Sequence, residues 1–280
     1  MNRPAGVTPL AIPESGPLFE GHFPGRPILP GIVLLHLALR ADPSGGAGGL
    51  AGIDMLRFRR LVLPGERLEV HWRAGDAPDR AAIAVRRGDE RVAEAVVRLQ
   101  QTPMSATRTA PASSSSHPAD EESVAAAPAA PDHADGVAPA TLLPHGPAAC
   151  FIESMRSESG DGVVCAARVP QAHALTVGGS APALVAIEMA AQAAGVFEAR
   201  RRARAGSAAA TEAGPRLGYL VGARDVRFAR ATLPATAACT ASIRLVGVAG
   251  ALTSYEFEVL CDGGTLAVGR VSTWLTATTS

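Results

Sequence analysis

The pattern of hydrophobic and polar residues is most distinctive over residues 19–40, FEGHFPGRPILPGIVLLHLALR. Its first half surrounds His22 and Phe23 with prolines, which fix φ, and glycines, which permit positive φ, so we expect a rigid irregular loop. The apolar run from Gly31 to Arg40 then predicts a buried helix that begins after Pro30. A histidine that lies at the start of a helix is a candidate catalytic residue, because the free backbone amides there can bind a carbonyl oxygen.

The rest of the first half has the pattern of short antiparallel strands. Leu68, Val70 and Trp72 alternate with polar residues, as in a half-buried strand. Residues 82–87 and 92–99 predict two further strands joined by a turn at Gly88-Asp89. Residues 7–12 offer one short strand before the loop.

The second half repeats this order of strands, loop, helix and strands. A helix is predicted over residues 181–204, with Ser180 as its N-cap. Strands are predicted at 151–155, 163–169, 217–221, 225–228, 239–248, 254–261 and 265–275. Residues 101–140 are rich in Ala, Pro and Ser without apolar periodicity, so we expect a flexible linker. The chain therefore divides into units at 1–100 and 141–280.

Composition narrows the function classes. The 26 basic and 26 acidic residues balance, which gives no support for nucleic-acid binding. The first residues lack the apolar stretch of a signal peptide, and no run approaches the ~20 apolar residues of a membrane span. The four cysteines have no C-x-x-C spacing, which argues against a zinc site and for reduced, mostly buried thiols. We expect a cytoplasmic protein without a membrane span.

Two motifs in order carry a family resemblance. Residues 21–31, GHFPGRPILPG, resemble the signature loop of hotdog-fold 3-hydroxyacyl-(acyl carrier protein) dehydratases, and residues 52–68 resemble the strand and turn after the central helix of that family. The second unit resembles the divergent dehydratases of aryl polyene gene clusters, and the first resembles their shorter companions. The resemblance implies an α+β double hotdog, in which each unit wraps an antiparallel sheet around a central helix.

The resemblance also implies catalytic residues, which are divided between the units. His22 matches the family's loop base, but the position of its acid, fourteen residues later, holds His36. The second unit has the helix pair Glu188 and Gln192 but no such loop; the matching position is Ala174, next to His173. If the units pair with each other, His22 and Glu188 complete one site, and His36 and His173 face a second, altered crevice.

Further binding residues follow from the same resemblance. The thioester carbonyl would be held by the amide of Gly31 or of Ala183, and the residues alone do not choose between them. Phe23 and Gln192 complete the predicted substrate-binding set. The LPH motif that ends at His145 matches a family entry motif of structural character. Basic residues are candidate contacts for an acidic carrier protein. They are Arg57, Arg59, Arg60, Arg200, Arg201, Arg202 and Arg204.

The function that the resemblance implies is dehydration of carrier-bound 3-hydroxyacyl thioesters to trans-2-enoyl thioesters, in fatty-acid or polyene-type synthesis. It implies no metal or redox cofactor, because phosphopantetheine carries the substrate. Two alternatives stay open: a non-catalytic subunit that binds acyl chains or carrier proteins, and a hotdog thioesterase. The units could pair within one chain as a pseudo-dimer or between chains as a homo-oligomer.

Overall fold

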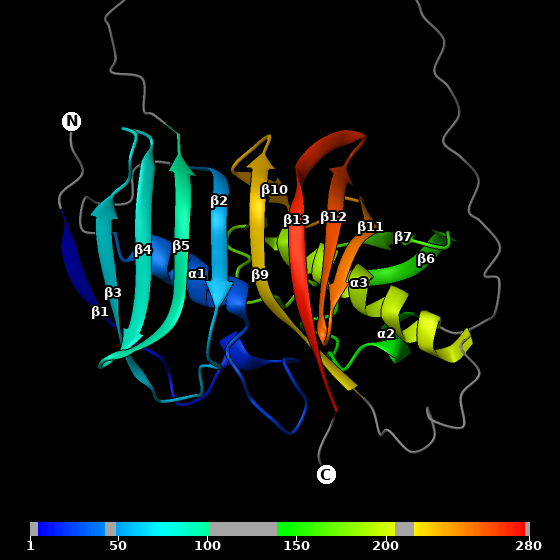
Figure 1. Cartoon of the computed structure of the whole chain (residues 1–280), viewed down its shortest axis with the longest axis horizontal. Coiled ribbons are helices and arrows are strands. Elements are labelled where there is room, and N and C mark those ends of the chain that lie inside the picture. Colours follow the sequence, from blue (N-terminus) through cyan, green and yellow to red (C-terminus); the bar gives the residue numbers. More distant parts are fainter. Residues whose placement is uncertain (1–4, 43–48, 101–138, 205–215, 278–280) are drawn as a thin grey trace, which may run out of the picture.

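One curved antiparallel sheet of eleven strands runs through the part of the chain that the structure describes (Figure 1). The computed structural model describes residues 5–42, 49–100, 139–204 and 216–277. In the first unit the elements are β1 (Gly6–Ala11), η1 (Pro17–Phe19), α1 (Gly31–Arg40), β2 (Leu50–Phe58), β3 (Arg67–Ala74), β4 (Arg80–Arg87) and β5 (Glu90–Leu99). In the second they are α2 (Pro139–Leu142), β6 (Ile152–Glu158), β7 (Gly162–Ala167), β8 (Ser180–Pro182), α3 (Val185–Arg204), β9 (Arg216–Phe228), β10 (Thr232–Pro234), β11 (Cys239–Ala249), β12 (Leu252–Cys261) and β13 (Gly264–Ala277).

The strand order is nearly the same when it is read outward from the centre in either direction. It is β1-β3-β4-β5-β2-β9-β13-β12-β11-β7-β6, so β2 and β9 meet in the middle, and each is the first strand after its unit's main helix. The two central strands share a sequence pattern, with a glycine followed five and six residues later by Arg-Phe, at Gly52 and at Gly222. The chain is therefore a pair of related units, as the repeated order of elements predicts.

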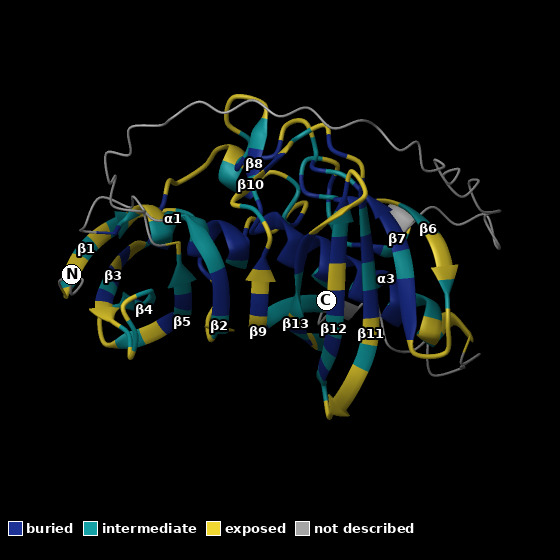
Figure 2. Ribbon diagram, turned by 90° about the horizontal axis from the view of Figure 1, so that it is seen from above, coloured by how far each residue is buried: buried dark blue, intermediate teal, exposed yellow. Residues whose placement is uncertain are grey.

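Both main helices lie on the concave side of the sheet (Figure 2). In α1, the apolar residues Ile32, Leu34, Leu35 and Ala38 are all almost fully buried and belong to the hydrophobic core. Apolar burial on this scale, at about 25 cal/mol per Å² of surface, is the main source of stability in such a layer. The ten residues of α1 make a short helix beside the 20 residues of α3, so the first unit is the shortened copy.

Two sequence predictions differ from the structure in detail, and a third concerns residues that lie mostly outside the described ranges. The helix of the second unit begins at Val185. The predicted N-cap, Ser180, belongs instead to β8, which pairs with β10. The Ser180 hydroxyl donates a hydrogen bond to Leu233 O. Residues 217–221 and 225–228 form one continuous strand, β9. The predicted linker lies outside the described residues except for its last two positions, which begin α2.

Pairing of β2 with β9 joins the two units within one chain. The register aligns Gly52 with Arg227 and Arg57 with Gly222. Gly222 is buried, and a Cβ on it would lie 2.6 Å from Leu56 O on the neighbouring strand. A side chain at this position would therefore push the two central strands apart. Arg98 also crosses the junction and donates to Val226 O at 2.8 Å.

Two of the cysteines correct the prediction of reduced thiols. Cys239 and Cys261 lie directly opposite each other on β11 and β12 and form a disulfide, while Cys150 and Cys165 are free. The pairing was not visible in the sequence because the two residues are 22 positions apart and only the strand register brings them together. In the described ranges, no helix has the length and apolar character needed to cross a membrane.

The junction can be tested with one glycine and a matched control. Gly222→Val should lower the free energy of unfolding by about 1–3 kcal/mol, because the side chain meets backbone of the partner strand. Gly247→Val adds the same side chain to β11, where a Cβ meets nothing within 4 Å, and should have little effect. Denaturant unfolding of both variants measures the difference. Equal stability of the two would show that close packing at the junction does not matter.

Candidate active site at the junction of the two units

The loop that carries His22 is fixed against the second unit by glycines. Gly21 has φ of +77°, which favours glycine, and a Cβ there would lie 2.9 Å from backbone atoms of both Gly146 and Ala149. Its carbonyl accepts a hydrogen bond of 2.8 Å from Gly146 N. The His22 ring then donates from Nδ1 to Ile28 O at 3.1 Å, which leaves Nε2 with its lone pair. Loop and ring orientation are thus both set by backbone contacts.

Glu188 lies in the first turn of α3 and is buried. Gln192, one turn further on, donates to Glu188 Oε1 at 3.1 Å and to Ala149 O at 2.7 Å, and its own Oε1 accepts from Phe151 N at 2.8 Å. A buried amide with these partners holds one orientation. The spacing of four residues places both side chains on one face of the helix, as the sequence predicts.

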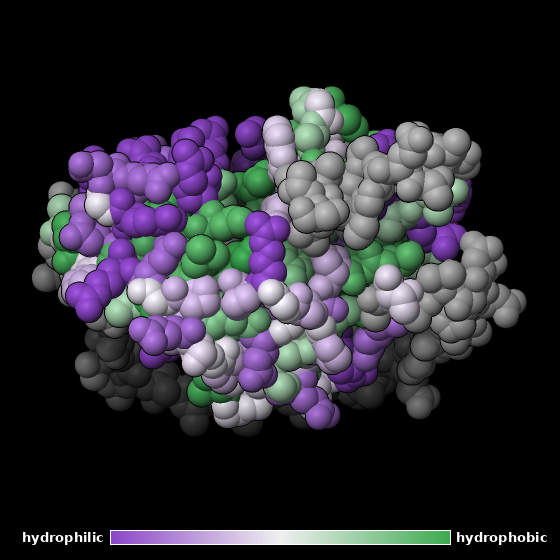
Figure 3. Space-filling view, turned by 90° about the horizontal axis from the view of Figure 1, so that it is seen from below, coloured by the Kyte–Doolittle hydropathy of each residue, from purple (hydrophilic) through white to green (hydrophobic). Residues whose placement is uncertain are grey.

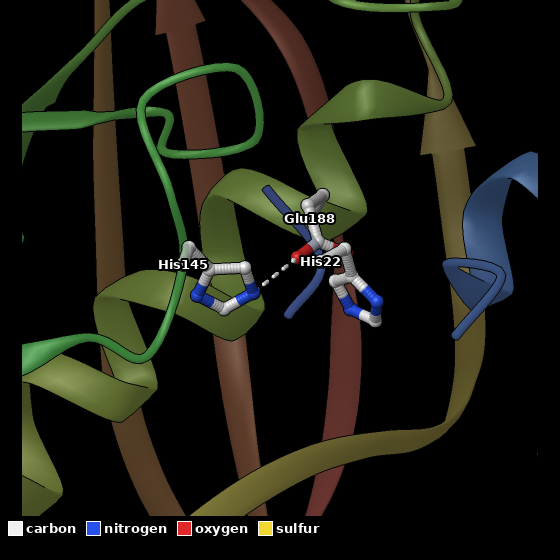
Figure 4. A group of neighbouring side chains, drawn as sticks. All are labelled: His22, His145 and Glu188. Carbon is white, nitrogen blue, oxygen red and sulfur yellow. Dashed lines mark ion pairs between the residues drawn. The ribbon is translucent and has the colours of Figure 1, made fainter. Parts of the chain in front are cut away.

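A third side chain, His145, completes the cluster. It follows α2, its side chain is 7% exposed, and its Nε2 lies 3.6 Å from Glu188 Oε1. Figure 4 shows the carboxylate of Glu188 between the two imidazoles, with His22 on its other side. One donor atom from each of His22, His145 and Glu188 lies within 4.8 Å of the others. The sequence indicates a structural role for the LPH motif, so His145 is not among the predicted site residues. Its place in the entry motif of the second unit is the sequence feature that could have identified it as a site residue.

Burial shifts the pKa of each member of this cluster in the direction that favours the neutral form of its side chain. Desolvation lowers the pKa of His22 to about 4 and that of His145 to about 3, and in His145 the neighbouring His22 adds to the effect. Burial raises the pKa of Glu188 to about 7, although its hydrogen bond from Gln192 acts in the opposite direction. Near neutral pH the site therefore offers two imidazole lone pairs beside a carboxyl group that still holds a proton in part of the molecules.

A cavity of about 320 Å³ leads away from this cluster. It follows one face of α3, past Ala191 and Gly195, to Glu198 and Arg202. From Glu188 to Arg202 this face extends about 21 Å, at 1.5 Å per residue. Most of the other lining residues are apolar. They include Leu34, Phe58, Leu142, Leu143, Leu220, Trp274 and Leu275. The arrangement suits a long apolar chain whose reactive end lies at the two histidines.

The structure distinguishes the two helix-start amides that the sequence left open. Gly31 lines the cavity of His22 and Glu188, and the first helical bond, from Leu34 N to Pro30 O, leaves the Gly31 amide without an intrahelical acceptor. A Cβ on Gly31 would lie 2.7 Å from the Phe58 ring, so glycine is needed there. By contrast, the amide of Ala183 donates to Ala231 O at 2.8 Å and lines a different cavity.

That second cavity, of about 460 Å³, lies at the equivalent place on the other side of the junction and contains His36. His173 is not among its lining residues, which corrects the expectation that the two histidines share a crevice. Instead His173 packs edge-on against Phe151, 4.8 Å between ring centroids, and its Nδ1 accepts from Leu175 N.

Some of the remaining predicted residues line the cavity and others do not. Phe23 stacks on His22, with ring centroids 4.2 Å apart, and supports the ring from behind without lining the cavity. Arg59 and Arg60 line the cavity and pair with Glu94 and Glu90. Arg200 and Arg204 both pair with Glu158, at the far end of α3.

These features define the class of the protein: a double hotdog with a candidate acid–base site assembled from both units. A family model described as ApeP dehydratase, ApeP-like, matches residues 137–279, about half of the chain, and the chain belongs to this family. A second model, described as ApeI dehydratase, ApeI-like, matches residues 5–95. The predicted fusion of two hotdog dehydratase units is thereby confirmed.

Individual proteins agree with this assignment. The chain is 37% identical over 75 residues to the 3-hydroxyacyl-[acyl-carrier-protein] dehydratase FabZ of Syntrophomonas wolfei, which covers 24% of this chain and 51% of that protein. It is 42% identical over 65 residues to FabZ of Myxococcus xanthus, covering 19% and 42%. The chain thus spans about half the length, or less, of these curated relatives. The dehydratase domain of the polyketide PpsC from Mycobacterium tuberculosis shares the fold, with TM-score 0.62 and 17% identity over 98% of this chain and 94% of that one.

The burial of Glu188 has a measurable consequence for stability. Its folded pKa of about 7 lies above the ordinary glutamate value of 4.5, so its contribution to the free energy of unfolding is fully present below about pH 4.5 and is lost as pH rises through about 7. Glu188→Gln removes this loss. Relative to the wild type, the variant should gain about 1–3 kcal/mol of unfolding free energy between about pH 5 and about pH 8.

Denaturant unfolding of both proteins across this pH range measures the gain. Glu20→Gln, which removes an exposed carboxylate from the loop before His22, is the control for loss of charge. A difference between Glu188→Gln and the wild type that stays constant with pH would contradict the proposed protonation state of Glu188.

Proposed function

We propose that this protein dehydrates 3-hydroxyacyl thioesters to trans-2-enoyl thioesters. The observation that carries the proposal is the meeting of His22 from one unit with Glu188 from the other inside one elongated apolar cavity. Membership in a dehydratase family and the FabZ relatives support the same reaction. The reaction requires a base at C2, an acid at the C3 oxygen and a donor for the thioester carbonyl, and the cavity offers one candidate for each.

His22 is the proposed base. Its Nδ1–H is bonded to Ile28 O, so the Nε2 lone pair is available to take the C2 proton, and the lowered pKa keeps the ring neutral. As the C2–H bond breaks, negative charge moves toward the thioester oxygen. The Gly31 amide at the start of α1 would donate to that oxygen and stabilise the charge.

Glu188 is the proposed acid. The C3–O bond breaks as the C2 electron pair forms the double bond, and the carboxyl proton of Glu188 converts the departing hydroxide to water. Burial raises the pKa of this group to about 7, which suits a proton donor near neutral pH. His145 and Gln192 are positioning residues, because both lie against the carboxylate and fix it on its side of the cavity.

The substrate is proposed to arrive on a carrier protein. Arg59 and Arg60 lie at the cavity, with side chains 43% and 60% exposed, and could contact an acidic carrier or its phosphopantetheine. Leu61 and Trp274, also lining residues, are 41% and 44% exposed, which suits an apolar entrance. Figure 3 shows hydrophobic surface in the middle of the face seen from below, with hydrophilic side chains beside it.

Mass spectrometry of a 3-hydroxyacyl carrier protein tests the reaction. We expect the wild type to remove one water, and His22→Ala and Glu188→Gln to lower the rate by about 10²–10⁴-fold, because each removes a proton-transfer group. His36→Gln is the matched control: this histidine lines the other cavity, so dehydration should continue unchanged.

The outcomes separate the rival functions. A product mass corresponding to free acid release would indicate a thioesterase. Failure of the wild type to react with several chain lengths, together with tight acyl-carrier binding, would indicate a non-catalytic subunit. If His36→Gln abolished dehydration and Glu188→Gln did not, the active cavity would be the other one.

The pH profile gives a second test of the assigned roles. kcat/KM should fall as pH rises through about 7, where Glu188 loses its proton, and as pH falls through about 4, where His22 gains one. The residual activity of Glu188→Gln should lack the alkaline limb. A profile whose alkaline limb is retained in that variant would assign the limb to another group.

A further inference from the structure

The cluster of His22, His145 and Glu188 has the composition of a transition-metal site. Two imidazoles and a carboxylate, contributed by the loop before α1, the segment after α2 and α3, bring one donor atom each within 4.8 Å of the others. Zinc bonds to such donors are about 2.0–2.2 Å long, which places neighbouring ligands of a tetrahedral ion about 3.4 Å apart. His145 Nε2 and Glu188 Oε1, at 3.6 Å, are already near this spacing.

Hydrogen-bond partners outside the cluster orient two of its three side chains, as is usual for metal ligands. A metal-bound histidine normally donates its other ring N–H to a carbonyl or carboxylate, and a metal-bound carboxylate is itself hydrogen-bonded. His22 donates from Nδ1 to Ile28 O, so its Nε2 is the donor that remains. Glu188 accepts from Gln192, which is held in turn by two backbone groups. These partners fix both the tautomer of the imidazole and the direction of the carboxylate.

The charge and the donor types of the cluster favour a transition-metal cation. No cationic side chain is among its three members, and the buried carboxylate of Glu188 lies 3.6 Å from His145 Nε2. Nitrogen donors select Zn²⁺, Co²⁺, Ni²⁺ or Cu²⁺ over Mg²⁺ and Ca²⁺, which prefer oxygen ligands.

We propose that Zn²⁺ binds reversibly to His22, His145 and Glu188 and inhibits the protein by occupying the reactive end of the cavity. An ion at this position takes the lone pair of His22 and the carboxylate of Glu188, the two groups that the proposed dehydration uses. It also stands between them where C2 and C3 of a substrate would lie. Binding of the ion to these three side chains does not depend on that reaction, whereas its inhibitory effect rests on the proposed function.

Calorimetric titration of the chelator-treated, tag-free chain with ZnCl₂ tests the proposal directly. We expect wild type to bind one Zn²⁺ at this site, and His145→Gln to weaken its affinity by at least about 100-fold because one of three ligands is lost. Gln192→Ala keeps all three ligands but removes the partner of Glu188, and should weaken binding by about 10–100-fold. His71→Gln is the matched control, since His71 lies on β3 and pairs with Glu69 away from the cavity.

Co²⁺ provides a spectroscopic measurement on the same proteins. Its visible absorption should report low-coordinate nitrogen and oxygen ligation in wild type and His71→Gln, and should be lost in His145→Gln. Thermal unfolding checks that each variant is folded; if His145→Gln does not fold, Gln192→Ala decides. Identical titrations of wild type and the folded site variants, or no binding at millimolar Zn²⁺, would overturn the proposal.

The dehydration assay separates this inference from the proposed function. Zn²⁺ should slow wild type competitively with the acyl substrate, and added chelator should restore the rate. If wild type binds Zn²⁺ as expected but never dehydrates, the metal site stands and the proposed reaction fails. If it dehydrates at the same rate in Zn²⁺ and in chelator, the reaction stands and the inhibitory site fails.

Discussion

The pairing of β2 with β9 is the contact on which the candidate site depends. It makes one sheet out of two units and brings the loop before α1 within hydrogen-bonding distance of the segment after α2, at Gly21 and Gly146. Backbone hydrogen bonds across the two central strands need close approach, and glycine at 222 provides it. Without this alignment His22 and Glu188 would belong to separate half-sites, each lacking the other's group.

The buried carboxyl group of Glu188 is the second feature that shapes the site. An ionised carboxylate in an apolar cavity is costly unless it is paired, and here its neighbours are an amide and two neutral imidazoles. The fold therefore keeps it partly protonated near neutral pH, which is useful for a proton donor and unfavourable for stability at higher pH. The raised pKa and the loss of stability are two consequences of the same burial.

The two crevices of the pseudo-symmetric pair have diverged in different ways. On one side of the junction the Gly31 amide faces a cavity with two histidines and a glutamate. On the other, the Ala183 amide is engaged by Ala231 O through the contact of β8 with the β10 segment, and His36 occupies the acid's position. The second crevice thus lacks both a free helix-start donor and a carboxyl group at the expected place, while keeping a cavity.

The sequence by itself determined the double-hotdog architecture, the bounds of α1 and most strands, and the division of His22 and Glu188 between units. The bounds follow from local periodicity and from Pro and Gly positions, which act over short stretches of chain. The architecture and the division of the two residues are what the family resemblance of the motifs implies. Tertiary structure alone decided three matters: that His145 joins the site, that His173 leaves the second crevice, and that Cys239 meets Cys261. Each depends on strand register or loop path between residues far apart in the chain. No local pattern encodes such a distance, because it is set by how the whole sheet and its helices pack.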